Sequence, residues 1–210
     1  GMLNGSLVKT RALYRGIMED IYSTYTTAVT GTAFPFTDMA ESRWSYPYIK
    51  ELYDAGVVSG TSATTFSPAA NVTRAQFVTM LAGLAGADVS NCPATPFRDV
   101  PEGAWYAPYV NWALANGIVS GTSATTFSPD ASITRQDMAV MLYSYTQRFQ
   151  VHLQQQPVTP FTDAGSIAAY AQVAVQTLQR AGVISGMPDG SFQPYGTATR
   201  EQACTMLCML

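Results

Sequence analysis

The stretch that decides the fold is Ser59-Gly60-Thr61-Ser62-Ala63-Thr64-Thr65-Phe66-Ser67-Pro68, which recurs letter for letter as residues 120–129. Ten identical residues in a row do not recur by chance in a chain of 210 residues, so the sequence contains an internal repeat. A more divergent third copy follows, in which Gly186 and Phe192 correspond to Gly121 and Phe127. The chain is therefore predicted to consist of three tandem units.

Working outward from the repeated stretch divides the whole chain. We expect an N-terminal helix or leader segment at residues 1–33, a first repeat at 34–90, a second at 91–150, a linker at 151–158 and a third repeat at 159–210. Apolar residues at helical spacing place the N-terminal helix at about residues 6–28. Because this helix belongs to no repeat, we expect it to cap the units or to lead to a domain upstream of this sequence.

Each unit is predicted to hold two helices. The first begins near an aromatic residue and ends at a glycine, a residue that commonly follows the end of a helix. These boundaries are Trp44 and Gly56, Trp105 and Gly117, and Tyr170 and Gly182. The second helix begins after a threonine with a polar residue three positions later, which is the pattern of an N-terminal capping box. These pairs are Thr73 with Gln76, Thr134 with Asp137, and Thr199 with Gln202.

The second helices carry matched apolar stripes at i, i+3 and i+4 spacing. The stripes contain Phe77, Met80 and Leu81 in the first unit, Met138, Met141 and Leu142 in the second, and Ala203, Met206 and Leu207 in the third. Three such helices bury their stripes most economically against one another. We therefore predict an all-α fold with a central three-helix bundle in a pseudo-threefold arrangement.

Composition excludes several classes of function. Charged residues make up 12% of the chain and the net charge is −3, whereas nucleic-acid-binding domains carry a basic face. One histidine and three cysteines are too few for a histidine-rich metal centre, and we expect no metal or cofactor. No apolar run is long enough to span a membrane, and the N-terminus lacks the basic and apolar regions of a signal peptide.

The pattern Phe-x-Asp, Trp, Gly-(Val/Ile)-(Val/Ile)-Ser-Gly, Phe-x-Pro and Thr-Arg resembles the S-layer homology repeat. The resemblance extends over about residues 34–210 in three tandem copies. The family motif Thr-Arg-Ala-Glu stands here as Thr-Arg-Ala-Gln at residues 73–76, and in more divergent form at residues 134–137 and 199–202. Departures from the family pattern include Gln76, Asp137 and Tyr170.

The resemblance implies a function outside the cell. Proteins of this family are non-covalent anchors of the bacterial cell surface, and grooves between their repeats bind acidic, often pyruvylated, secondary cell-wall polysaccharide linked to peptidoglycan. The resemblance also implies that the motif arginines, Arg74, Arg135 and Arg200, meet the acidic group. The alternative is a protein–protein scaffold in which the same grooves bind an acidic peptide or a surface-layer partner.

The residues themselves leave the role of the arginines open. A cation at the first position of a helix opposes the helix dipole, so three such arginines indicate compensation by an anion. A helix N-terminus together with a guanidinium group suits a ligand carboxylate. The alternatives are an internal ion pair with Asp38, Asp99 or Asp163, or a solvated arginine.

Other candidate ligand-binding residues also have structural alternatives. Trp44, Trp105 and Tyr170 offer ring faces to a sugar, or pack the first helix onto the core. Gly60, Gly121 and Gly186 allow close approach of a ligand, or permit a turn with positive φ. We expect Asp38, Asp99 and Asp163 to brace the units rather than to touch sugar.

No enzymatic chemistry is predicted. A glycosidase would require a pair of acidic residues in one cleft, and the acidic residues form no recurring pair in the repeats. The sequence also contains no nucleophile motif and no phosphate-binding motif. Cys204 and Cys208 are four residues apart on one predicted helix, and apolar residues occupy the equivalent positions in the other units. We therefore expect them to be buried thiols rather than metal ligands.

Overall fold

A computed structural model describes residues 34–210, and in this part of the chain the regular structure is helical, without strands. The α-helices are α2 (Tyr46–Asp54), α3 (Arg74–Ala85), α4 (Ala107–Ala115), α5 (Arg135–Arg148), α6 (Gln172–Arg180) and α7 (Arg200–Cys208). Two short 3₁₀ turns precede α6, η1 (Ala164–Ser166) and η2 (Ala169–Ala171). The predicted helix at residues 6–28 lies outside the described residues.

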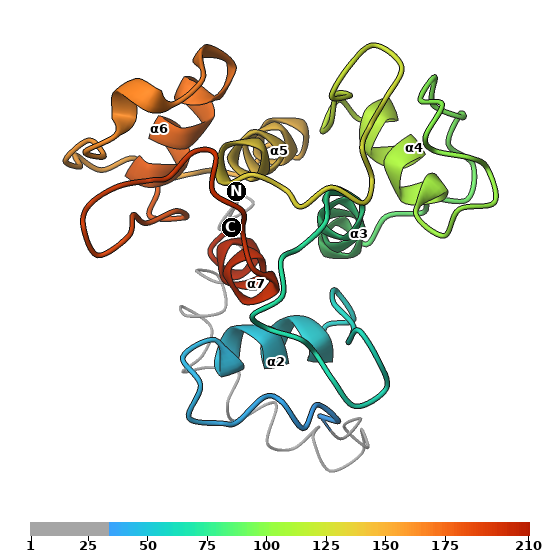
Figure 1. Ribbon diagram of the computed structural model, residues 1–210, viewed down its shortest axis with the longest axis horizontal. Helices are drawn as coiled ribbons and strands as arrows, with labels where there is room; N and C mark the ends of the chain where they lie inside the picture. Colours follow the sequence, from blue (N-terminus) through green and yellow to red (C-terminus); the bar gives the residue numbers. More distant parts are fainter. Residues whose placement is uncertain (1–33) are drawn as a thin grey trace, which may run out of the picture.

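The helices form a centre and three lobes (Figure 1). Helices α3, α5 and α7 lie together at the centre, while α2, α4 and α6 lie at the periphery. Each peripheral helix packs against the central helix of the preceding unit in cyclic order, α4 on α3, α6 on α5 and α2 on α7. We call residues 34–68, 95–129 and 159–194 lobes 1, 2 and 3. The central three-helix bundle was predicted, and nothing in the described residues conflicts with a pseudo-threefold arrangement.

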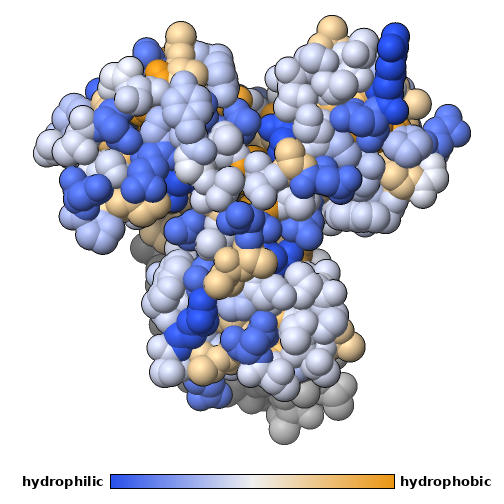
Figure 2. Space-filling model, viewed as in Figure 1, coloured by the Kyte–Doolittle hydropathy of each residue, from blue (hydrophilic) through white to orange (hydrophobic). Residues whose placement is uncertain are grey.

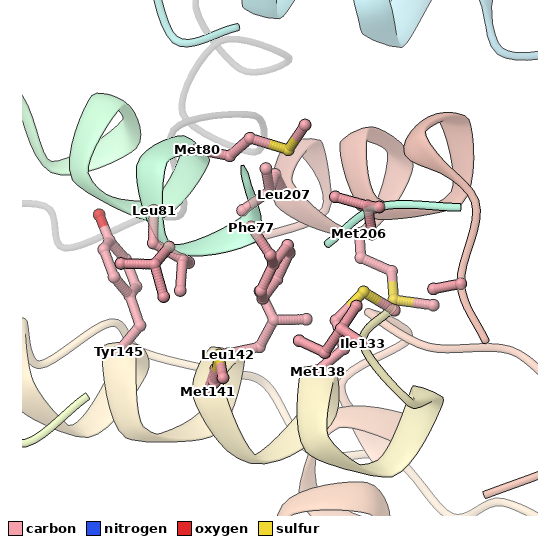
Figure 3. Packing of buried hydrophobic residues seen from close by; sticks show 14 of the residues in the cluster. Phe77, Met80, Leu81, Ile133, Met138, Met141, Leu142, Tyr145, Met206 and Leu207 are labelled. Carbon is pink, nitrogen blue, oxygen red and sulfur yellow. The ribbon is translucent and has the colours of Figure 1, made fainter. Parts of the chain in front are cut away.

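The apolar stripes of the central helices meet as predicted. In Figure 3, Phe77 of α3 points between Leu142 of α5 and Leu207 of α7. All three side chains are at most 1% exposed. Full burial of one such side chain stabilises a fold by about 1.5–3 kcal/mol, so this contact contributes to the association of the three helices.

Helix boundaries follow local sequence signals. The peripheral helices begin two residues after Trp44, Trp105 and Tyr170, and α2 and α4 carry a proline in the first turn, where its missing N–H costs nothing. Gly56, Gly117 and Gly182 follow the helix ends with φ values of 71°, 68° and 70°, as predicted. The capping boxes of Thr73 with Gln76 and of Thr199 with Gln202 are also confirmed. Thr134 caps α5, but Asp137 returns no bond to it.

A ring of backbone hydrogen bonds ties the three units together before their central helices. The N–H of Val72 donates to Ala198, that of Ala198 to Ile133, and that of Ile133 back to Val72, at 3.0, 3.2 and 3.0 Å. All three residues are fully buried. Because the third unit bonds to the first, the three units close into one body rather than forming an open row.

Candidate functional site

Each motif arginine reaches into the next unit of the ring. The guanidinium Nε donates to the backbone carbonyl of a phenylalanine, and Nη2 donates to that of a serine. The Nε bonds join Arg74 to Phe127 at 2.8 Å, Arg135 to Phe192 at 2.7 Å and Arg200 to Phe66 at 2.9 Å. The Nη2 bonds join the same arginines to Ser120 at 3.4 Å, Ser185 at 3.3 Å and Ser59 at 2.8 Å. The arginines therefore hold lobes 2, 3 and 1 to the bundle.

These arginines are buried, with 3–5% of each residue exposed. The guanidinium carbon lies over the ring of the same phenylalanine, 4.8 Å from its centroid for Arg74, 5.1 Å for Arg135 and 4.5 Å for Arg200. Burial lowers the pKa of all three arginines. The sequence predicted that an anion compensates the positive charge of each arginine. In the structure the phenylalanine ring face and the carbonyl oxygens stabilise this buried charge.

The third guanidinium nitrogen distinguishes the three units. Nη1 of Arg74 lies 3.3 Å from Oδ2 of Asp137. Within residues 34–210, Nη1 of Arg135 and Nη1 of Arg200 have no protein partner. The only fully buried side-chain polar atom without a partner in this part of the chain is Oγ1 of Thr95, so both Nη1 atoms reach solvent.

The N-termini of the central helices are occupied by the protein itself. The N–H groups of Arg74 and Ala75 donate to the carbonyls of Ala131 and Pro129, at 2.9 and 3.0 Å. The equivalent carbonyls accept the first two N–H groups of α5 and α7. The hydroxyls of the cap threonines accept the third N–H group of each central helix, that of Gln76, Asp137 or Gln202. The expectation that a ligand carboxylate meets a helix N-terminus is therefore wrong, because only the guanidinium is open to it.

The aspartates brace the loops, as predicted. Each carboxylate accepts hydrogen bonds from two consecutive backbone N–H groups. The first belongs to the phenylalanine whose ring contacts a motif arginine, and the second belongs to the next residue in the sequence. The amide pairs are Phe66 and Ser67 on Asp38, Phe127 and Ser128 on Asp99, and Phe192 and Gln193 on Asp163. Burial alone would raise the pKa of Asp99, but these bonds outweigh it and lower that pKa. Within residues 34–210, none of these three aspartates forms an ion pair with a motif arginine, and the acidic partner of Arg74 is Asp137.

The three aromatic candidates are exposed rather than packed in the core. Trp44, Trp105 and Tyr170 are 55%, 58% and 62% exposed, so the interpretation that they pack the first helix onto the core is wrong. Figure 2 shows three lobes separated by hollows. The hydroxyl of Tyr170 donates to Oδ1 of Asp137 at 2.7 Å, which brings this ring beside Arg74.

Arg74, Asp137 and Tyr170 come from three different units and define one groove, which we call the Arg74 groove. Because the arginine contacts recur in cyclic order, the equivalent residues define two more grooves. By this equivalence we assign Arg135, Gln202 and Trp44 to an Arg135 groove, and Arg200, Gln76 and Trp105 to an Arg200 groove. Each predicted arginine thus has one predicted aromatic residue of another unit at the equivalent position, and for Tyr170 the bond to Asp137 places the ring beside Arg74.

The glycines at the loop entrances are required by crowding. A Cβ on Gly60 would lie 2.5 Å from the carbonyls of Ser62 and Thr65, and one on Gly121 would lie 2.3 Å from that of Ser123. Gly186 is slightly less crowded, with the Ser191 carbonyl at 2.9 Å. None of the three has a positive φ, so the alternative of a turn with positive φ is wrong for these glycines.

Arg43 is a site residue that sequence reasoning missed. Its Nε and Nη2 donate to the Glu201 carboxylate at 2.8 and 2.9 Å, and Ser45 Oγ donates to the same carboxylate at 2.7 Å. This cluster docks lobe 1 on α7 directly beside Trp44. The signal was present, because the other units have alanine at the position of Arg43, and alanine or glutamine at that of Glu201.

The remaining predictions concern the cysteines, metal ligands and membrane-spanning helices. Cys204 and Cys208 are buried, as predicted, and burial raises the pKa of Cys204 to about 12. Residues 34–210 contain no cluster of three or more His, Cys, Asp and Glu side chains suited to a metal ion. Among the described helices, none has the length and apolar character needed to cross a membrane.

The geometry of three interlocked units agrees with a comparison to known families. The sequence model of the S-layer homology domain matches this chain three times, at residues 35–78, 96–139 and 160–204. This chain belongs to the S-layer homology family. Each S-layer homology match runs from the first residues of a lobe into the first turns of the following central helix.

Similar S-layer homology segments occur in larger proteins. An endoglucanase of Bacillus sp. (strain KSM-635) is 37% identical over 208 residues, which are 98% of this chain and 22% of the relative. A cellulosome-anchoring protein of Acetivibrio thermocellus is 28% identical over 73% of this chain and 35% of the relative. An S-layer protein of Bacillus thuringiensis subsp. finitimus is 25% identical over 94% of this chain and 23% of the relative. The chain thus spans about a third or less of these relatives.

Proposed function

We propose that this chain is a non-covalent anchor that binds acidic, for example pyruvylated, secondary cell-wall polysaccharide in the grooves between its lobes. Family membership and the surface-layer and cellulosome-anchoring relatives support a role at the bacterial cell surface. The observation that carries the glycan proposal is the pairing in the Arg135 and Arg200 grooves. A buried guanidinium there presents one Nη to solvent, and an exposed tryptophan occupies the equivalent position of the same groove.

This pairing suits an acidic sugar. The open Nη1 donates a charge-assisted hydrogen bond to a carboxylate, and the tryptophan ring stacks on the apolar face of a pyranose. Because Nε and Nη2 are already fixed by backbone carbonyls, the guanidinium loses little freedom on binding. Several grooves on one repeating polymer add avidity of about 10²–10⁴ over a single site.

The chain itself performs no catalysis in this proposal. The enzymes among the relatives align over a small part of their length, 22% for the endoglucanase and 9% for an amylopullulanase of Thermoanaerobacterium thermosulfurigenes. We assign to this chain the shared anchoring function, and any catalytic domain it tethers lies outside this sequence.

The proposal is tested by co-sedimentation with cell walls of Bacillus and Acetivibrio, before and after extraction of the secondary polysaccharide. The variant Trp44→Ala/Trp105→Ala removes the two exposed rings and should lower wall affinity about tenfold or more. Its stability should stay within about 0.5 kcal/mol of the wild type, because the rings are exposed. Phe149→Ala, which alters a partly exposed ring at the far end of α5, serves as control.

A wild-type chain that fails to sediment with unextracted walls would overturn the proposal, as would equal sedimentation before and after extraction. In the latter case binding to a protein or to peptidoglycan would take the place of the acidic polysaccharide. Motif arginines are unsuitable for this test, because each holds a lobe to the bundle and its loss disturbs the fold.

A further inference from the structure

Two departures from the repeat pattern meet in a single groove. Asp137 stands where the other units have Gln76 and Gln202, and Tyr170 stands where they have tryptophan. The two substituted residues bind each other, since the Tyr170 hydroxyl donates to Asp137 Oδ1 at 2.7 Å. Oδ2 of the same carboxylate lies 3.3 Å from Arg74 Nη1. Asp137 therefore links residues of all three units.

The length of the side chain explains why only Asp137 turns toward the arginine. The Oε1 atoms of Gln76 and Gln202 accept the N–H of their own cap residues, Thr73 and Thr199, at 3.1 and 3.0 Å. Aspartate is one methylene shorter and makes no such bond to Thr134. Its carboxylate is left to bind the nearest donors, which are Arg74 and the Tyr170 hydroxyl.

We propose that Asp137 closes the Arg74 groove to acidic ligands, so that only the Arg135 and Arg200 grooves bind the polysaccharide. This inference rests on the proposed function and names the residue that selects between grooves. The carboxylate occupies the one guanidinium nitrogen that the ligand acid would use. It is held there by the fold, so it competes without the loss of translational freedom that a sugar suffers on binding.

Charge strengthens the exclusion. A ligand carboxylate entering the Arg74 groove would meet Asp137 at close range, and two like charges repel strongly in a partly desolvated site. The side chain of Asp137 is 27% exposed and that of Arg74 is 6% exposed, so solvent screens this repulsion only in part. In the other two grooves glutamine at the same position carries no charge.

The test follows the three arginines separately by NMR in the intact chain labelled with ¹⁵N-arginine. Each Nε–H donates to a carbonyl, which slows its exchange with water, and each lies over a different phenylalanine ring that assigns it by proximity. The probe is wall polysaccharide solubilised with a muramidase from walls that sediment the wild-type chain. The same material after mild acid removal of its pyruvate ketals is the control ligand.

Wild type should show shifts at Arg135 and Arg200 and none at Arg74. In Asp137→Gln, which restores the residue of the other units, all three signals should shift. In the reciprocal variant Gln202→Asp the Arg135 signal should no longer shift when the polysaccharide is added. Gln202→Asn, which is equally short but uncharged, should behave like wild type. The number of responding grooves would thus change from two to three or to one.

Equal responses of all three arginines in wild type would overturn the inference and leave the anchoring function intact. Continued silence of Arg74 in Asp137→Gln would also overturn it. If the chain co-sediments with walls but no arginine signal shifts in any variant, the guanidinium groups do not contact the acidic group and the inference fails. If no walls sediment the chain, the proposed function fails first, and this inference fails with it.

Discussion

The Arg74 groove and the Arg135 groove share one framework and differ in what meets the last guanidinium nitrogen. In both, Nε binds a phenylalanine carbonyl, at 2.8 and 2.7 Å, and Nη2 binds a serine carbonyl, at 3.4 and 3.3 Å. Nη1 of Arg74 then meets Asp137, whereas Nη1 of Arg135 reaches solvent. The difference shows that two nitrogens of each motif arginine bind backbone carbonyls of the next unit, whereas the surroundings of the third differ between the grooves.

Replacing the arginines tests the shared part of this comparison and should have the largest effect. Arg135→Ala leaves the buried carbonyl of Phe192 and the partly buried carbonyl of Ser185 without this donor, and it removes the contact with the Phe192 ring. We expect a loss of the order of 3–5 kcal/mol in the free energy of unfolding, measured with urea. Arg74→Ala should cost slightly more, because Asp137 also loses its cation. A loss below about 1 kcal/mol for either variant would refute the structural role.

Glu201 tests a second difference, the charged docking of lobe 1. Burial would raise the pKa of Glu201, but hydrogen bonds from Arg43 and Ser45 and the charge of Arg43 outweigh it and lower that pKa. A lowered pKa contributes stability that is present above the unfolded value of about 4.5 and is lost as the pH falls through the folded value. Glu201→Gln should therefore cost about 1–2 kcal/mol at neutral pH and flatten the acid limb of the stability curve.

The matched control is Glu41→Gln, which changes an exposed carboxyl of the same lobe. Urea unfolding between pH 3 and 7 compares both variants with the wild type. If Glu201→Gln leaves the acid dependence of wild type unchanged, the Arg43 cluster contributes nothing to docking. Glu201→Gln also weakens the hold on Arg43, which precedes Trp44 in the sequence. Because Trp44 is assigned to the Arg135 groove, we expect any change in wall binding to arise in that groove.

The smallest effect concerns Tyr170 in the Arg74 groove. Burial, the bond to Asp137 and its charge raise the pKa of Tyr170 to about 12. A raised tyrosine pKa gives stability that is lost as the pH rises from the ordinary value of about 10 toward 12. Asp137→Asn should lower the Tyr170 pKa and reduce this alkaline loss. The change is measured from tyrosinate absorbance during alkaline titration, with Asp88→Asn at the opposite end of α3 as control. Equal titration curves for Asp137→Asn and Asp88→Asn would contradict the hydrogen bond between Tyr170 and Asp137.

Local signals predicted much of the fold. The identical stretches at residues 59–68 and 120–129 predict the repeats, and Thr73 and Thr199 with their glutamines predict the start of the central helices. These features depend on residues within a few positions of one another, so they can be read without the partner units. The ring formed by Val72, Ile133 and Ala198 has no such signal, because its bonds join residues that are 61 to 126 positions apart.

The candidate site was predicted in its members but not in its connections. Sequence reasoning selected the arginines and the aromatic residues, and it placed the arginines correctly at the first helical positions. It did not foresee that loop carbonyls of the next unit accept the helix N–H groups that a ligand carboxylate would need. It noted Asp137 and Tyr170 as separate departures from the family pattern. That they touch could not be derived, since one belongs to the second unit and the other to the third.

The sequence by itself determined that three similar units fold around three apolar helices, because repeat identity, caps and stripe periodicity are local and independent of topology. Only the tertiary structure decided that the third unit closes on the first and that each arginine serves the unit after its own. It also decided that one carboxylate reaches one of three equivalent guanidinium groups. Such contacts depend on the cyclic order of units in space. An aspartate and a tyrosine in place of glutamine and tryptophan then separate the Arg74 groove from the other two.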